Sequence, residues 1–377
     1  MTRRDCLTAA GALVSSACQR RKTRGYSGYA LVATSGEPSL AVVDLQSFRL
    51  LKNIPLGAPP TAVVPAHTLN GSYVLTPSTD SVHRIDGNLR VALSRRLAGQ
   101  LLEIRLAPDG RALLALAGGS RELILADPDS LRIMRRVKLS APPANFDIAS
   151  NGYVAVSTGT SGVVELFHLA SGDHRRIERA GTIGAVRFRA DGRLLLAADL
   201  VSRSILALSV PTLEIVAELP IAMRPENLCF KVDQGQLFVS GHGMDGIAIV
   251  FPYDVLKVEQ TVLAGRDPGV MACSDTPDYL FVASASGSDV CIMNIDTRKV
   301  IGLVEIGSRP TYITITPGDQ FALLLSGDSN EMAVIHIPAV LASQSDPFKL
   351  RYRSGAALFT VVPVGSKPVH AAVIPRV

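Results

Sequence analysis

The chain is poor in the patterns that mark membrane spans, disulfide frameworks and the common catalytic sites. Although 47% of its 377 residues are hydrophobic, no uninterrupted apolar stretch reaches the roughly 18 residues that a membrane-spanning helix requires. There is no tryptophan, and the five cysteines show no C-x-x-C spacing. Neither G-x-S-x-G nor H-E-x-x-H, the signatures of serine hydrolases and zinc peptidases, occurs. The sequence therefore predicts no membrane-spanning helix, no catalytic residue and no metal site.

Two of the cysteines, Cys6 and Cys18, belong to an N-terminal segment that differs in composition from the rest of the chain. The other three, Cys229, Cys273 and Cys291, are odd in number. A free cysteine in a protein core behaves as a small apolar residue. We therefore expect these three to be buried packing residues and not a disulfide framework.

Positive charge is concentrated at the N-terminus. The chain has a formal charge of +5, but residues 1–24 contain six positive side chains and one negative one. The remainder therefore carries equal numbers of the two signs. A nucleic-acid-binding domain keeps its basic excess on the folded surface, so the sequence excludes nucleic acid as a partner.

Residues 1–18, MTRRDCLTAAGALVSSAC, have the layout of an export signal. A charged start is followed by an apolar run of about a dozen residues and a small-residue end. The segment TRRDCL resembles the twin-arginine motif, and SSAC resembles a bacterial lipobox that would place a lipid on Cys18. Cleavage after Ala17 is the alternative. We predict an exported, periplasmic protein, held at a membrane only by such a lipid, with a linker over residues 19–28.

A four-residue turn, G-x-x-P, recurs along the rest of the chain. Degenerate copies fill the gaps, so that the starts are spaced by 41 to 43 residues, with a last interval of 58. The full copies are Gly57–Pro60, Gly265–Pro268, Gly307–Pro310 and Gly365–Pro368, and the degenerate ones start at residues 99, 140, 181 and 222. A period of this length indicates a repeat architecture.

Each period contains four short β-type runs separated by turn residues. In the repeat at residues 279–319, the segments LFVAS and CIMNID precede the turn, and YITIT follows it. Glycine supplies the positive φ of a tight turn, and proline is tolerated at a strand start, where no ladder hydrogen bond is needed. Four strands per period near 42 residues is typical of a β-propeller blade.

This repeat resembles the YVTN family of β-propeller repeats, and the resemblance covers residues 29–377. The WD-repeat family is a poor match because its Gly-His and Trp-Asp signatures are missing. The sequence thus predicts one all-β propeller domain over residues 29–377. We count eight blades, with seven as the alternative. Residues 369–375 form a strand with no blade after it, and residues 29–56 lack a first strand, so we expect the C-terminal strand to complete the first blade.

A G-x-G-x-x-G pattern at Gly241, Gly243 and Gly246 is the fingerprint of a dinucleotide-binding loop. Such a loop needs a helix N-terminus to meet the phosphates. Here the glycines are followed by IAIVFP, a β run that ends in proline. We therefore expect a hairpin loop and no nucleotide site.

Strands alternate in direction within a blade, so the loops between second and third strands lie on the same face as the G-x-x-P turns. This loop-rich face surrounds the channel mouth and is the expected binding face. Positions two residues after the turn proline, among them Asn145, Asn227 and Tyr312, could point into the channel. The predicted ligand-binding residues are Arg224, Glu226, His242, Arg309, Tyr312, Lys367 and His370.

From this loop-rich face we predict that the propeller is a non-catalytic module that binds a protein or a polar small molecule and carries no cofactor. The resemblance implies two alternatives. The first is a hydrolase similar to the lactonase propellers, which would require carboxylates and His or Arg converging at the channel mouth. The second is a haem-binding propeller similar to the tetrapyrrole domain of nitrite reductases, with His370 or His242 as the axial ligand.

Overall fold

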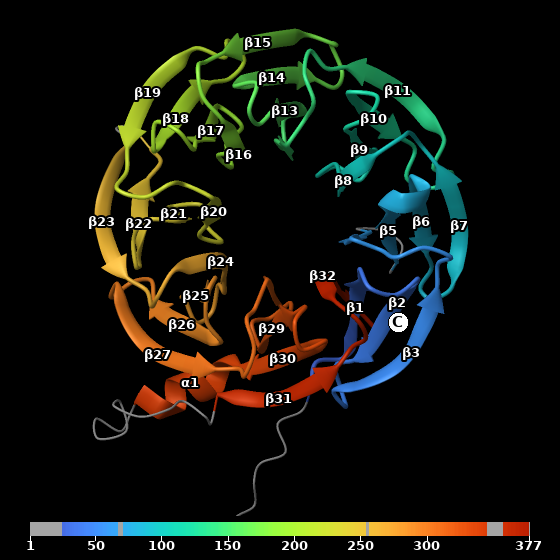
Figure 1. Cartoon of the computed structure of the whole chain (residues 1–377), viewed down its shortest axis with the longest axis vertical. Coiled ribbons are helices and arrows are strands. Elements are labelled where there is room, and N and C mark those ends of the chain that lie inside the picture. The colour runs from blue at the N-terminus through green and yellow to red at the C-terminus, as the bar shows by residue number, and fades with distance from the viewer. Residues whose placement is uncertain (1–24, 67–70, 254–255, 345–356, 377) are drawn as a thin grey trace, which may run out of the picture.

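The computed structural model describes residues 25–66, 71–253, 256–344 and 357–376. These residues form eight antiparallel sheets of four strands each, arranged as blades around a ring (Figure 1). The predicted eight-bladed, all-β propeller is therefore confirmed, and the alternative of seven blades is wrong. The predicted export signal and Cys18 lie outside the described residues, as does most of the predicted linker.

In every blade the four strands are ordered from the centre of the ring to its rim. The innermost strands are β32 (Pro368–Pro375), β4 (Ala62–Pro65), β8 (Leu101–Leu106), β12 (Asn145–Ile148), β16 (Ile183–Phe188), β20 (Asn227–Phe230), β24 (Pro268–Cys273) and β28 (Tyr312–Ile315). The second strands are β1 (Gly28–Thr34), β5 (Ser72–Thr76), β9 (Leu113–Ala117), β13 (Tyr153–Ser157), β17 (Leu194–Asp199), β21 (Leu237–Ser240), β25 (Tyr279–Ser284) and β29 (Phe321–Ser326).

The outer half of each blade completes the sheet. The third strands are β2 (Ser39–Asp44), β6 (Ser81–Ile85), β10 (Glu122–Ala126), β14 (Val163–His168), β18 (Ser204–Ser209), β22 (Gly246–Phe251), β26 (Asp289–Asn294) and β30 (Glu331–His336). The outermost strands are β3 (Arg49–Pro55), β7 (Val91–Arg96), β11 (Ile133–Lys138), β15 (His174–Glu178), β19 (Ile215–Pro220), β23 (Lys257–Leu263), β27 (Lys299–Glu305) and β31 (Leu358–Pro363).

Burial follows the position of a strand within its blade. The second strands β25 and β29, YLFVAS and FALLLS, are buried at every residue, because neighbouring blades cover both faces of the sheet. In one such interface, Val32 and Ala41 of the first blade pack with Leu323 and Leu325 of the last. The outermost strands are largely exposed, as in β3 and β11. Two-sided burial accounts for the high apolar content of the chain.

The C-terminal strand closes the ring. β32 pairs with β1 in antiparallel register, with Tyr29 opposite Ile374 and Leu31 opposite Ala372. β32 is thus the innermost strand of the first blade, ahead of β1, β2 and β3. The predicted closure is confirmed, and it pairs the inner edge of β1 that would otherwise be open.

The G-x-x-P turns adopt the conformation that their sequence requires. Gly57, Gly265, Gly307 and Gly365 all have positive φ, between 76° and 97°. Residues that carry a side chain rarely adopt this backbone conformation, so glycine is needed at the start of each turn. The turns lead into the innermost strands, which places the residues after each proline near the centre of the ring.

The G-x-G-x-x-G segment is a hairpin loop, as predicted. A Cβ atom on Gly241 would collide with the carbonyl oxygen of Arg224, so the loop needs glycine for close backbone packing. Gly246 begins β22, a buried strand, and no helix follows. The described residues contain one α-helix, α1 (Ile337–Gln344), between β30 and β31. Within the described part of the chain, no helix has the length and apolar character to cross a bilayer.

Candidate functional site

Four of the predicted binding residues lie on the exposed rim of the loop-rich face. Nε of Arg224 lies 3.5 Å from Oε1 of Glu226, and their side chains are 51% and 42% exposed. Nε of Arg309 lies 3.3 Å from Oδ2 of Asp328. His242 is 81% exposed. Exposed ion pairs of this kind contribute roughly 0–1 kcal/mol to stability, so these charges are free to serve a ligand at little cost to the fold.

Lys367 joins the last blade to the first through its backbone. Its N–H donates to Oδ1 of Asn330 at 2.8 Å, and its carbonyl oxygen accepts from the N–H of Ser35 at 2.9 Å. The residue has a φ of 52°, so the turn holds it in the left-handed region. Its position follows from ring closure, and it lies apart from the Arg224–Glu226 pair, which belongs to the loop before β20.

Tyr312 and His370 come together on neighbouring innermost strands. Their ring centroids are 4.4 Å apart, and Tyr312 Oη donates to the carbonyl oxygen of Ala371 at 3.0 Å. Nδ1 of His370 accepts from the N–H of Val63 at 3.4 Å. Burial raises the pKa of Tyr312 to about 12. Burial and, second, the positive charge of Arg105 lower the pKa of His370 to about 4, so both side chains are neutral near pH 7.

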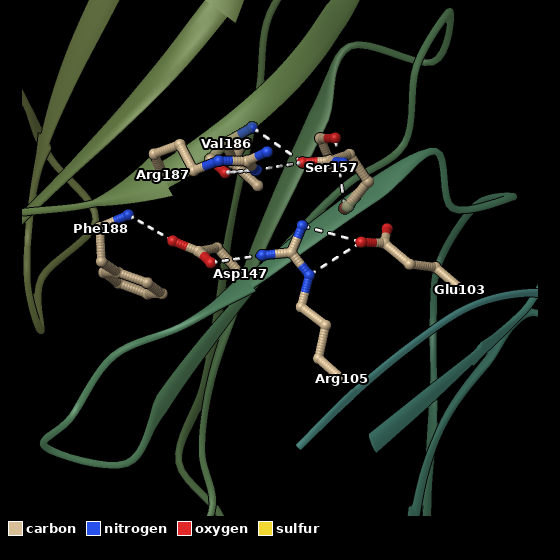
Figure 2. A network of polar contacts seen from close by, with 8 residues as sticks. Glu103, Arg105, Asp147, Ser157, Val186, Arg187 and Phe188 are labelled. Carbon is tan, nitrogen blue, oxygen red and sulfur yellow. Dashed lines mark hydrogen bonds and ion pairs between the residues drawn. The ribbon is translucent and has the colours of Figure 1, made fainter. Parts of the chain in front are cut away.

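A charged network on the innermost strands β8 and β12 was not predicted (Figure 2). Arg105 donates from Nε to Oε1 of Glu103 at 2.8 Å and from Nη1 to Oδ1 of Asp147 at 2.7 Å. The other carboxylate oxygen of Asp147 accepts the N–H of Phe188 at 2.8 Å. One guanidinium thus holds two carboxylates, and the network links three successive blades. The side chains of Arg105, Glu103 and Asp147 remain 25%, 29% and 17% exposed, so solvent reaches them.

Arg187 on β16 lies beside this network without a carboxylate of its own (Figure 2). Its Nη1 donates to Oδ1 of Asn145 at 3.1 Å and to the carbonyl oxygen of Val186 at 2.7 Å. Nε and Nη2 form no hydrogen bond, and the guanidinium no ion pair, with any described residue. Burial and then the positive charge of Arg105 lower the pKa of Arg187. The result is a fixed, partly buried guanidinium with one unused edge.

The next two innermost strands carry cysteines. Sγ of Cys229 on β20 lies 3.7 Å from Sγ of Cys273 on β24. Both residues are only partly buried, whereas Cys291 is fully buried. All three are free thiols that pack in or against one hydrophobic cluster, as expected, but Cys229 and Cys273 are only partly buried because they belong to strands that border the centre of the ring.

A surface pocket of about 310 Å³ lies between the sixth and seventh blades. Its wall includes Lys231, Phe251, Glu259 and Arg298. Nη2 of Arg298 lies 2.7 Å from Oε2 of Glu259, and Lys231 contacts two carboxylates at 2.7 Å. These charges already satisfy one another, so this pocket offers fewer unused polar groups than the centre of the ring.

The sequence contains a signal for the charged network that the turn pattern alone does not show. The innermost strand LLEIRL carries charged residues at two alternate positions, and the innermost strands NFDI and IGAVRF carry one charged residue each. Alternate residues of a strand point to the same side. The turn pattern singles out only one position in each innermost strand, two residues after the turn proline. Two residues further along the strand, on the same side, Asp147 follows Asn145 and Cys229 follows Asn227.

Neither a protein-family model nor a functionally curated protein matches the sequence. Solved structures do share the fold. Dihydro-heme d1 dehydrogenase NirN, in complex with DHE, aligns with a TM-score of 0.74 and 14% identity over 93% of this chain and 76% of that chain. A functionally unknown protein from Desulfotomaculum acetoxidans aligns with a TM-score of 0.62 and 12% identity over 93% and 99%.

A candidate 6-phosphogluconolactonase from Bacteroides fragilis aligns with a TM-score of 0.57 and 16% identity over 84% of this chain and 97% of that chain. At such low identity these likenesses concern the fold and not the chemistry of a site. Membership of the YVTN repeat family stays a prediction. What the chain shares with these proteins is the architecture of the β-propeller.

Proposed function

We propose that this protein is a binding module that holds a small anionic molecule, carrying a carboxylate or phosphate group, at the centre of the propeller. The observation that carries the proposal is the unused edge of Arg187. A planar guanidinium binds carboxylate and phosphate groups through two parallel hydrogen bonds. Nη1 of Arg187 is engaged by Asn145 and Val186, which leaves the Nε and Nη2 edge for a ligand.

The surroundings of Arg187 make this edge a strong anion site. Partial burial reduces the screening of the charge by water, and so strengthens its attraction for an anion. The hydrogen bonds to Asn145 and Val186 fix the plane of the guanidinium before a ligand arrives, which lowers the entropic cost of binding. Arg105 adds a second positive charge nearby, but Glu103 and Asp147 largely neutralise it.

The rim residues fit this proposal as an entrance. Arg224, Arg309 and Lys367 lie on the face from which a ligand would approach the innermost strands, and exposed charges increase the rate at which an oppositely charged molecule arrives. The protein would be exported and periplasmic, with a lipid on Cys18 as its only membrane attachment. NirN, a solved propeller-containing protein of similar fold, is described in complex with DHE, which is consistent with a small-molecule ligand here.

Thermal unfolding with anionic probes tests the proposal. Citrate and inorganic phosphate should raise the Tm of the wild-type protein, because a ligand that binds only the folded state stabilises it. Arg187→Gln should abolish this rise, and Arg187→Lys should retain part of it. Arg49→Gln, at an exposed residue of the outermost strand β3, is the matched control and should respond to the probes nearly as wild type does. An Arg187→Gln protein that gains as much Tm as wild type would refute the site.

A hydrolase resembling the lactonases remains the second candidate, because carboxylates and arginines do converge. Arg105 engages Oε1 of Glu103 and Oδ1 of Asp147, while Phe188 engages the other oxygen of Asp147. Oε2 of Glu103 accepts no hydrogen bond from a described residue, and it is the group that could act as a base. Hydrolysis of a glucono-lactone that disappears in Glu103→Gln, with the fold intact, would favour this candidate over pure binding.

The residues fit a haem-type cofactor poorly. The predicted axial ligands are His370 and His242. Because Nδ1 of His370 accepts the N–H of Val63, the proton of the neutral ring lies on Nε2, and neither nitrogen offers a free lone pair to a metal. His242 is 81% exposed, with Nδ1 3.9 Å from Oδ1 of Asp267, on the rim and away from the innermost strands. We therefore propose no role for a tetrapyrrole.

A further inference from the structure

Two cysteines face each other across a blade boundary at the centre of the ring. Cys229 is the next-to-last residue of β20, and Cys273 is the last residue of β24. Their Sγ atoms are 3.7 Å apart, and both residues are partly exposed. A disulfide bond requires about 2.05 Å between the sulfur atoms, so a movement of roughly 1.7 Å, within the range of side-chain rotation, would bring them into bonding distance.

The surroundings make the two thiols unequal. The hydrogen bond with Cys273, the largest effect, lowers the pKa of Cys229, as does the positive charge of Arg187, while burial opposes both. The same hydrogen bond and burial raise the pKa of Cys273. The thiolate is the reactive form of cysteine. The pair thus has one side chain suited to attack and one that retains its proton, the arrangement found in reactive dithiols.

We propose that Cys229 and Cys273 form a redox-active dithiol, whose oxidation by a small disulfide compound links the sixth and seventh blades at the centre of the ring. The Cys229 thiolate attacks one sulfur of the compound R–S–S–R, forms a mixed disulfide and releases RS⁻. Cys273 then loses its proton and attacks Sγ of Cys229, which forms the protein disulfide and releases the second RS⁻. The two protons leave with the two RSH molecules, and the compound takes up two electrons.

The third cysteine provides an internal control. Cys291 on β26 is 2% exposed and packs among Phe238, Ile249 and Met293. Burial raises the pKa of its thiol to about 12. The structure therefore assigns it no redox role, and it should remain a free thiol under conditions that oxidise the other two.

Mass spectrometry of the full chain tests the proposal. Cys6→Ser and Cys18→Ser in the same chain remove the N-terminal thiols. Treatment with oxidised glutathione should lower the intact mass by two hydrogen atoms, and digestion should yield one peptide pair joined through Cys229 and Cys273. Dithiothreitol should restore both thiols. Two free thiols after this treatment, or two separate glutathione adducts, would overturn the proposal. Free thiols together with tight uptake of one Cu(I) ion would overturn it in favour of a metal site.

Single substitutions test the assigned order of events. Cys273→Ser should trap a mixed disulfide between glutathione and Cys229, whereas Cys229→Ser should react severalfold more slowly at Cys273. The reverse order of reactivity would refute the assignment.

Arg187 acts here as a positioning residue through its charge. Arg187→Gln should slow formation of the mixed disulfide severalfold, and Arg187→Lys should restore the rate. Equal rates in the two variants would remove Arg187 from the proposal. This comparison uses the uncharged disulfide of 2-mercaptoethanol in place of oxidised glutathione, which carries carboxylates. The assay then contains no carboxylate or phosphate group, so its outcome does not depend on the proposed anion site.

Discussion

Acid should destabilise the ring through the single imidazole of His370. Burial, reinforced by the positive charge of Arg105, lowers the pKa of this group from 6.5 to about 4. Between these two values the unfolded chain binds a proton that the folded chain does not. The free energy of unfolding therefore falls as the pH drops from about 6.5 towards 4, and it is unaffected by this group above pH 6.5.

The magnitude follows from the same two pKa values. Each pH unit across the window is worth about 1.36 kcal/mol, so the contribution of His370 approaches about 3 kcal/mol at pH 4. His370→Gln should remove this contribution. The glutamine amide oxygen can still accept the N–H of Val63, and it cannot be protonated in this range. Other titrating groups are common to both proteins and cancel in the comparison.

Denaturant unfolding at pH 7.5 and pH 4 measures the difference. The wild-type protein should lose about 3 kcal/mol more stability between these pH values than His370→Gln does. The imidazole signals of His370 should titrate near pH 4 in an NMR experiment on the folded protein. His242→Gln, at a side chain that is 81% exposed, is the matched control and should lose stability as wild type does. Equal losses in wild type and His370→Gln would refute the reasoning.

Three further predictions concern closure, export and the rim. Deleting residues 366–377 should lower the free energy of unfolding by about 4 kcal/mol or more, because Ile374 and its neighbours leave the core; a Tm equal to that of wild type would contradict this closure. Changing the twin-arginine pair to lysines should retain precursor in the cytoplasm, and Cys18→Ala should release the protein from membranes, as cell fractionation would reveal. The double change Arg224→Ala and Arg309→Ala should alter stability by about 1 kcal/mol or less, yet weaken probe binding measured by calorimetry if the rim is the entrance.

The architecture was predictable because its information is local and repeated. Gly307 and Pro310 define one turn, and the same spacing at Gly265 and Pro268 shows that the turn recurs. Positive φ at these glycines follows from the steric properties of the residue. Ring closure was also predictable, since a strand at residues 369–375 without a blade has one open edge to pair with.

The chemistry at the centre of the ring was less accessible from the sequence. Arg105 and Asp147 are 42 residues apart, and their contact depends on the angle at which one blade packs against the next. A pattern with period two shows which side of a strand a residue occupies, but not whether it points across the ring or sideways to a neighbour. Asp147 does the latter, since it accepts the N–H of Phe188 on the next blade.

Closure by β32 also affects how the protein is made. Ser35, just after β1, and its partner Lys367, just before β32, are 332 residues apart. At a translation rate of roughly 5–20 residues per second, β1 leaves the ribosome roughly 15–65 s before its partner is synthesised. Throughout that time the first blade has a bare β-edge, which can pair with other nascent chains. Blades 2 to 8 can complete their sheets as they emerge, whereas the first blade depends on the last strand, so translation speed and chaperone supply should limit the yield of closed rings.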